Sequence, residues 1–169
     1  ELEITFEFQI NPDIRFKPQV IISGIPSNVL SKLGKRVLDN LIFNLGLVEM
    51  LSYWKTTCSP EIEIRSGSLN KEQINWWKNL IFNGMGQFFY ENRIDFTAKN
   101  FLTIKTPAET VSGNVFRKKL KDAILIPIGG GKDSVVTLEI LKKVKREICC
   151  FSLNPTDAAE KVIKISGCK

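Results

Sequence analysis

The stretch Ala123-Ile124-Leu125-Ile126-Pro127-Ile128-Gly129-Gly130-Gly131-Lys132-Asp133-Ser134-Val135-Val136 decides the fold of its part of the chain. Its first six residues form a continuous apolar run, which predicts a strand buried on both faces of a parallel sheet. A glycine loop follows. Apolar residues then recur at helical spacing and predict a helix, at Val135, Leu138, Leu141 and Val144. The order is therefore strand, glycine loop, helix.

The glycine loop has the composition of an anion-binding site. Three consecutive glycines leave the backbone N–H groups free to converge on an anion, and the following helix points its positive end at the same place. Lys132 adds a cation and Ser134 a hydroxyl donor, while Asp133 is suited to capping the helix or holding Mg²⁺. These residue types predict a polyphosphate ligand. The alternative is a glycine turn that binds nothing.

Two common phosphate loops do not fit this stretch. In a Walker A loop, Asp133 would have to be Ser or Thr, and Ile126 would have to be the first glycine. The dinucleotide fingerprint needs a third glycine where Ser134 stands and an acidic residue where Asn154 stands. The chain therefore carries neither motif.

The residues after the loop extend the same pattern. A second apolar strand is expected at 148–153, and a turn at 154–157 leads into a helix near Ala158. This order opens a doubly wound α/β domain with a parallel sheet. Such domains usually need about 100–150 residues. Since far fewer follow residue 113, we expect the domain to be incomplete here.

The residues before the loop predict a separate α+β region, which makes the whole chain mixed α/β. The polar segment 106–113 is the expected boundary, giving domains 1–113 and 114–169. An Asn70–Gln73 capping box predicts a helix start, and a long helical stripe begins near Val29, where Gly34 and Gly46 either break the helix or permit close packing. Strands are expected at 4–10, 19–23 and 96–104.

Composition limits the chemistry. The 169 residues carry a net charge of +6, and nine basic against four acidic residues between Asn114 and Glu147 place most of it around the loop. A local positive field suits nucleotide phosphate or nucleic acid. The chain has no histidine, which excludes Ser-His and Cys-His nucleophile pairs.

Compartment and completeness can also be inferred from the sequence. No apolar run is long enough to span a membrane, and no signal peptide is recognisable. The four cysteines fit no zinc spacing and are expected to be reduced, buried thiols of a cytoplasmic protein. Because the chain begins with Glu1 rather than Met, we expect a processed or excised fragment that lacks the carboxyl-terminal part of its own chain.

Residues 129–134 resemble the PP-loop of ATP pyrophosphatases, Ser-Gly-Gly-x-Asp-Ser, at five of six positions. Gly129 replaces the first serine, and Lys132 occupies the variable position. The resemblance implies that Gly130, Gly131, Asp133 and Ser134 hold the pyrophosphate of ATP. Gly129, which lacks the hydroxyl of the motif serine, and Lys132, through its charge, are expected to complete this binding set. From their charges we also expect Lys132 and Asp133 to be catalytic and Asp133 to bind Mg²⁺.

Four segments together resemble the bacterial UDP-N-acetylmuramoyl-L-alanyl-L-glutamate epimerase family: 45–55, Trp76-Trp77, 88–92 and 127–136. The resemblance covers about 21–153. It implies an ATP-dependent isomerase of peptidoglycan synthesis, which adenylates the terminal L-glutamate of a nucleotide-sugar peptide and epimerises it with ATP and Mg²⁺. The resemblance does not identify the base that removes the α-proton. By chemical type alone, the candidates are Glu49, Lys55, Cys58 and Glu91. Of these, Glu49 is placed with Lys132 and Asp133 in the expected catalytic set.

Two other functions remain open from the sequence. A PP-loop enzyme that adenylates tRNA would use the basic segment and Cys149-Cys150, although no Cys-x-x-Cys pair is present. Nucleic acid is a partner only in this reading. A nucleotide-binding module without catalysis, serving a partner protein, is the other possibility.

Overall fold

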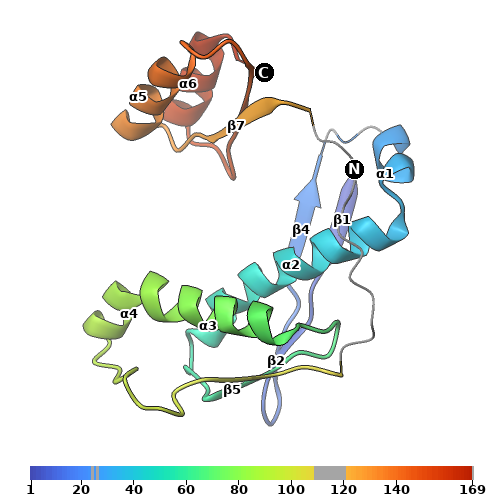
Figure 1. The fold of residues 1–169 in the computed structure, drawn as a ribbon, viewed down its shortest axis with the longest axis vertical. Helices are drawn as coiled ribbons and strands as arrows, with labels where there is room; N and C mark the ends of the chain where they lie inside the picture. The colour runs from blue at the N-terminus through green and yellow to red at the C-terminus, as the bar shows by residue number, and fades with distance from the viewer. Residues whose placement is uncertain (24, 26, 109–120, 169) are drawn as a thin grey trace. The chain divides into compact units, whose positions relative to one another are not determined.

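A computed structural model describes residues 1–23, 25, 27–108 and 121–168. The chain divides into two compact units, Glu1–Phe116 and Arg117–Lys169 (Figure 1). The expected boundary between residues 113 and 114 lies outside the described residues. Within the described parts the fold is mixed α/β, with four two-stranded sheets. The expected mixed class is confirmed at this level.

The amino-terminal unit begins with an antiparallel ribbon of four short strands, β1 (Leu2–Thr5), β2 (Phe8–Ile10), β3 (Ile14–Phe16) and β4 (Gln19–Ile22). β1 pairs with β4, and β2 pairs with β3. The predicted strand at 4–10 is therefore split. At the break the backbone N–H of Phe6 donates to the Pro18 carbonyl at 3.0 Å.

The long helical stripe forms two helices, α1 (Ser27–Leu33) and α2 (Lys35–Trp54). Gly34 separates them with φ 79°, which favours glycine. Gly46 lies inside α2, where an ideal Cβ would stand 2.9 Å from the ring of Phe6. Both expected roles of glycine are therefore present. Gly34 ends a helix, and Gly46 permits close packing.

The capping box at Asn70 is confirmed as the start of α3 (Lys71–Gly84). The Asn70 side chain accepts from the Gln73 N–H at 2.8 Å, and the Gln73 side chain accepts from the Asn70 N–H at 2.9 Å. α4 (Gly86–Glu91) follows. β5 (Glu61–Glu63) and β6 (Thr103–Lys105) pair in parallel. The predicted strand at 96–104 is wrong for most of its length, because only its end pairs with β5.

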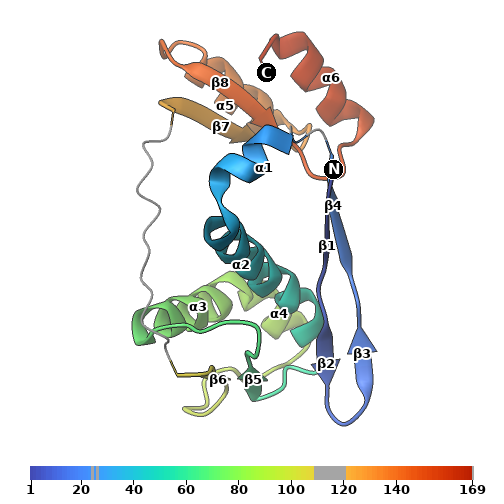
Figure 2. The same cartoon turned by 90° about the vertical axis from the view of Figure 1, so that its right-hand side faces the viewer.

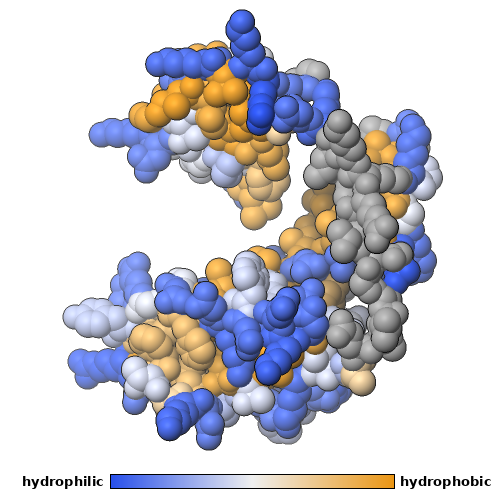
Figure 3. All heavy atoms as spheres, in the orientation of Figure 1, coloured by the Kyte–Doolittle hydropathy of each residue, from blue (hydrophilic) through white to orange (hydrophobic). Residues whose placement is uncertain are grey.

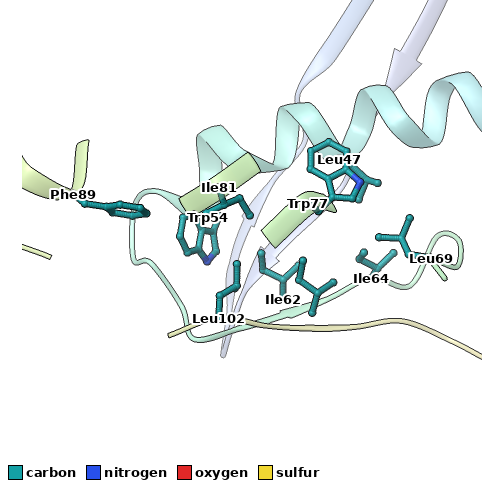
Figure 4. Packing of buried hydrophobic residues seen from close by; sticks show 10 residues of the cluster. Leu47, Trp54, Ile62, Ile64, Leu69, Trp77, Ile81, Phe89 and Leu102 are labelled. Carbon is teal, nitrogen blue, oxygen red and sulfur yellow. The ribbon is translucent and has the colours of Figure 1, made fainter. Parts of the chain in front are cut away.

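Large apolar side chains from α2, α3, α4 and the β5–β6 sheet form the core of this unit (Figure 4). Phe89 and Ile81 are almost completely buried. Trp54 is also buried, and its indole N–H donates to the Ser59 carbonyl at 2.8 Å, which satisfies the polar atom of the ring. Of the adjacent pairs Trp76–Trp77 and Phe88–Phe89, Trp77 and Phe89 are buried in the core, Phe88 packs against it, and Trp76 is 58% exposed.

The carboxyl-terminal unit follows the predicted order. It contains β7 (Ala123–Pro127), α5 (Lys132–Leu141), β8 (Glu147–Phe151) and α6 (Asp157–Ser166). β7 and β8 lie side by side and parallel (Figure 2). Ile126 and Ile128 are buried beneath the helices, whereas Leu125 is 67% exposed. The predicted burial of this strand on both faces is wrong in this structure, since one face of the two-stranded sheet is uncovered.

None of the helices in the described parts of the chain is both long and apolar enough to cross a membrane.

Substitutions at two neighbouring residues of α4 test which side chains belong to the core. Replacing Phe89, which is fully buried, by alanine should lower the free energy of unfolding by about 3–5 kcal/mol, because it leaves a cavity. Replacing Tyr90, which is 86% exposed, should change it by less than about 0.5 kcal/mol. Urea unfolding followed by tryptophan fluorescence measures both. Equal losses would contradict the assignment of Phe89 to the core.

Candidate phosphate-binding loop

The glycine loop is held between the carboxyl ends of two parallel strands. The N–H of Ile128 donates to the Phe151 carbonyl at 2.7 Å, so pairing continues one residue beyond β7. The hydroxyl of Ser152 donates to the Ile128 carbonyl at 2.8 Å. These two bonds tie the start of the loop to the end of β8. The carboxyl ends of parallel strands are where α/β proteins bind ligands.

Gly130 is required by the fold. Its φ of +84° lies in the left-handed region that disfavours side chains. In addition, an ideal Cβ at this position would stand 2.6 Å from the backbone nitrogen of Ala159 and 3.0 Å from the Cβ of Ala158. The loop therefore lies directly against the first turn of α6, with no room for a side chain between them.

Gly129 and Gly131 have no such structural reason. An ideal Cβ at either position meets no atom within 4 Å. Gly131 has φ −83° and ψ 174°, extended backbone that any residue adopts, and Gly129 lies outside the left-handed region. Both are exposed. The absence of side chains here leaves the backbone at Gly131 open to an approaching group, whereas the Gly129 N–H donates to the hydroxyl oxygen of Ser134.

The two helices of this unit differ at their amino ends. α6 is capped by Thr156, whose hydroxyl oxygen accepts from the Ala159 N–H at 3.3 Å, and its first turn carries two acidic residues, Asp157 and Glu160. α5 has Gly131 as its N-cap residue and no side-chain cap. Its first N–H groups are therefore available to an external acceptor, with the helix dipole behind them. Asp133 is in the first turn but does not take the capping position.

The side chains of the loop complete the anion site. Ser134 accepts a hydrogen bond from the Gly129 N–H at 3.1 Å, which fixes the loop and leaves the hydroxyl hydrogen free to donate. Lys132 and Asp133 are exposed in the first turn of α5. Free amides, a cation and a hydroxyl at one helix end suit phosphate oxygens.

A divalent ion also fits this chemistry. No group of three His, Cys, Asp or Glu side chains that could hold a metal occurs within the described ranges. Mg²⁺ is usually bound through one or two carboxylates together with substrate phosphates and water. The exposed carboxylate of Asp133, beside the place where phosphates would bind, is such a ligand. Its role as a metal ligand stays a prediction.

The other candidate catalytic residues lie in the amino-terminal unit. Glu49 is half-buried on α2, and Lys55, just after that helix, places its ammonium 5.9 Å from the centre of the Phe88 ring. Glu91 accepts a hydrogen bond from the Gln87 amide at 2.8 Å. Burial raises the pKa of Cys58 above its usual value, so this thiol stays protonated at neutral pH.

Sequence reasoning did not identify three residues that shape the loop. Ser152 ties the strand ends together, and Ala158 with Ala159 makes the surface on which Gly130 lies. The available signal was the pair of alanines after Thr156-Asp157. Two of the smallest side chains at the start of a helix permit close backbone approach.

Comparison with known proteins supports one family. A family model described as the MurL N-terminal domain matches residues 1–169. A UDP-N-acetyl-alpha-D-muramoyl-L-alanyl-L-glutamate epimerase of Xanthomonas oryzae pv. oryzae is 31% identical over 139 residues, which cover 82% of this chain and 30% of the relative.

Proteins of the same name from Salinispora tropica and a Micromonospora species are each 26% identical, over 149 and 152 residues. Those matches cover 88% of this chain and 32% and 33% of the relatives. The chain thus spans about a third of the length of the curated relatives that it matches. No solved structure matches it.

The glycines of the loop should respond differently to substitution. Gly130→Ala should destabilise the protein by at least about 1–2 kcal/mol, because the left-handed backbone and the contact with Ala159 both oppose a side chain. Gly131→Ala should leave stability unchanged or raise it by about 0.4–1 kcal/mol. Chemical denaturation measures both, and equal destabilisation would contradict the packing described for Gly130.

Proposed function

The chain belongs to the MurL N-terminal domain family, and from this premise we propose that it is the phosphate-handling part of an ATP-dependent epimerase. The substrate would be UDP-N-acetylmuramoyl-L-alanyl-L-glutamate, whose terminal L-glutamate is inverted during peptidoglycan synthesis. The names of the relatives support the epimerase class and the nucleotide-sugar peptide. ATP, Mg²⁺ and the PP-loop chemistry are the further content of the proposal.

One observation carries the assignment of the loop. Gly130 is explained by the fold, but Gly129 and Gly131 are not, because a side chain at either position would meet open space. A ligand that approaches the backbone closely would explain why glycine, rather than a residue with a side chain, stands at both positions. The uncapped start of α5 and the cation of Lys132 indicate that this ligand is anionic.

The chemistry explains why ATP is needed. The α-proton of a glutamate carboxylate is very weakly acidic, because the carbanion would form beside a negative charge. Transfer of AMP to the carboxylate removes that charge and acidifies the α-position. The loop amides and Lys132 would hold the departing pyrophosphate, and Ser134 would donate its hydroxyl hydrogen to it. Mg²⁺, when bound by Asp133 and the phosphates, would offset their charge.

Glu49 is the proposed base that removes the α-proton. The protonated thiol of Cys58 is a poor base, and Lys55 is an exposed ammonium over an aromatic ring. Glu91 is exposed and already accepts a hydrogen bond from Gln87. The half-buried carboxylate of Glu49 is the remaining candidate on α2. A half-buried position limits access of water to the carbanion.

The carboxyl-terminal unit is proposed to be the beginning of a larger PP-loop domain. Two parallel strands with helices on one face do not close an α/β sheet, and each outer strand edge would be unpaired. The curated relatives are about three times the length of the matched stretch, which leaves ample chain for the remaining strands.

The full-length protein, incubated with ATP, Mg²⁺ and the nucleotide-sugar dipeptide, should release AMP and pyrophosphate and place D-glutamate in the product. Asp133→Ala should abolish both the release of AMP and pyrophosphate and the formation of D-glutamate. Glu49→Gln should abolish inversion but retain release of AMP, because it removes the base alone. Nucleotide chromatography and chiral analysis of glutamate measure these outcomes.

Two results would redirect the proposal. Release of AMP without inversion in the unmodified protein would keep the adenylating loop and send the search to another acceptor, with tRNA first. Binding of ATP without turnover would indicate a nucleotide-binding module.

A valine at Gly131 separates ligand binding from folding. The extended backbone there suits a β-branched residue, so Gly131→Val should fold normally but lower ATP affinity by about tenfold or more. Gly86→Val is the matched control, since Gly86 also has open space around it but begins α4 in the other unit. Isothermal titration and thermal unfolding measure the pair. Unchanged affinity in Gly131→Val would remove the loop from the binding site.

A further inference from the structure

The amino-terminal unit contains a groove of about 450 Å³. It lies between three segments, which are ribbon residues 5–7, helix α2 and residues 62–66. Its volume is within the range of about 300–1,000 Å³ that is usual for small-molecule sites. Figure 3 shows hydrophilic residues, in blue, with apolar atoms, in orange, between them on the surface of this unit. The groove has the same mixed character.

Two aromatic rings form fixed walls of the groove. Phe6 comes from the ribbon and Phe43 from α2. Each ring lies against a glycine, since an ideal Cβ would stand 2.9 Å from the Phe6 ring at Gly46 and 2.7 Å from the Phe43 ring at Gly67. Apolar side chains complete the floor, at Ile42, Leu47, Met50, Ile62 and Ile64. An aromatic, apolar slot of this kind suits a flat ring.

Charged side chains surround the apolar floor. The three carboxylates that line the groove are paired with cations: Glu7 with Arg15 and Lys17, Asp39 with Lys35, and Glu63 with Arg65. Four cations against three carboxylates leave these pairs with one positive charge. Carboxylates accept hydrogen bonds from hydroxyl groups, and cations bind phosphate oxygens. The rim therefore suits a ligand that carries both hydroxyl and phosphate groups.

A free strand edge borders the groove. Among the described strands, β5 pairs only with β6, and Figure 2 shows β5 between β6 and the ribbon. The N–H of Ile64 donates to the Lys105 carbonyl at 2.8 Å, so the backbone groups of Ile64 face β6. Because successive residues of a strand alternate, the N–H and carbonyl of Glu63 turn to the other edge. This donor and acceptor match the neighbouring carbonyl and N–H of a uracil ring.

We infer that this groove binds the uridine of the nucleotide-sugar substrate, with the uracil against Phe6 and Phe43 and the ribose hydroxyls at Asp39. The diphosphate lies at the rim, where cations are available. The inference rests on the proposed function, which supplies a substrate that carries uridine diphosphate. ATP is already assigned to the loop of the carboxyl-terminal unit, so uridine is the nucleoside that still needs a site.

The groove also agrees with the position of the proposed base. Glu49 follows Ile42 by seven residues, which is close to two helical turns, so both lie on the same side of α2. Asp39 and Glu49 are about 15 Å apart along the helix axis. The diphosphate and the sugar separate the uridine from the glutamate in this substrate. Binding of its two ends at different levels of one helix therefore fits its length.

Binding of UDP to the full-length protein, measured by isothermal titration, tests the site. Ser66 is exposed and lines the groove, so Ser66→Trp should lower the affinity for UDP by about tenfold or more and leave the affinity for ATP unchanged. Ser31→Trp is the matched control, because Ser31 is exposed on α1 and does not line the groove. It should change neither affinity. Absence of UDP binding, or unchanged UDP affinity in Ser66→Trp, would overturn the inference.

The ribose hydroxyls give a readout that general damage to the fold would not move. The unmodified protein should bind UDP about tenfold or more tightly than 2′,3′-dideoxyuridine diphosphate, which leaves the Asp39 carboxylate without its donors. Asp39→Ala should bind the two ligands equally. A preference for UDP that persists in Asp39→Ala would overturn the placement of the ribose.

If Ser66→Trp prevents folding, the unmodified protein still decides. Irradiation of its complex with 4-thiouridine diphosphate should attach the base to a peptide that contains Phe6 or Phe43, which mass spectrometry identifies. Attachment to residues 121–168 instead would overturn the inference. So would displacement of UDP by an equal concentration of ADP, because the groove would then accept nucleotides in general.

The same variants separate the two proposals. UDP bound in the groove of a protein that forms no AMP from ATP and the substrate would support the groove and remove the ATP-dependent chemistry. AMP and D-glutamate formed by Ser66→Trp as efficiently as by the unmodified protein, at low substrate concentration, would keep the proposed function and remove the groove from substrate binding.

Discussion

The contact between the Gly130 backbone and the first turn of α6 is the constraint on which the carboxyl-terminal unit depends. An ideal Cβ would stand 2.6 Å from the nitrogen of Ala159, so the loop and the helix approach as closely as backbones can. This contact fixes where the chain leaves β7 relative to the helix that follows β8. The start of α5, and with it Lys132 and Ser134, takes its position from there. A packing requirement of the fold thus determines the geometry of the candidate site.

The amino-terminal unit uses glycine in a related way. Gly46 admits the ring of Phe6 against α2, and Gly67 admits the ring of Phe43, with an ideal Cβ 2.9 Å and 2.7 Å from the respective rings. The first contact attaches the antiparallel ribbon to the helix, and the second attaches the segment after β5. Contacts between aromatic rings and the backbone of glycines, rather than ion pairs at the surface, join the parts of this unit. The surface ion pairs, such as Lys35–Asp39, are exposed and contribute little.

Local rules predicted much of this structure, and contacts distant in sequence account for what they missed. The capping box at Asn70, the helix break at Gly34 and the strand–loop–helix order around Gly129–Ser134 depend on neighbouring residues alone. The strand expected at 96–104 failed because pairing with β5, which lies about forty residues earlier, selects only Thr103–Lys105. The packing of Gly130 was missed for the same reason, because Ala158 and Ala159 contact it only in the folded chain and their small size was the one local sign of it. The roles of Glu49, Lys132 and Asp133 remain predictions.

Packing requires glycine at only one of the three loop positions, Gly130, and this difference has a consequence for evolution within the family. Selection for folding acts on Gly130, because any side chain there strains the backbone and strikes α6. Selection on Gly129 and Gly131 has no such source in the packing. Under the proposed function, a descendant that no longer bound phosphate would be free to lose these two glycines while it kept the third. The glycine pattern alone would then distinguish lineages that retain only the architecture from those that also retain the chemistry.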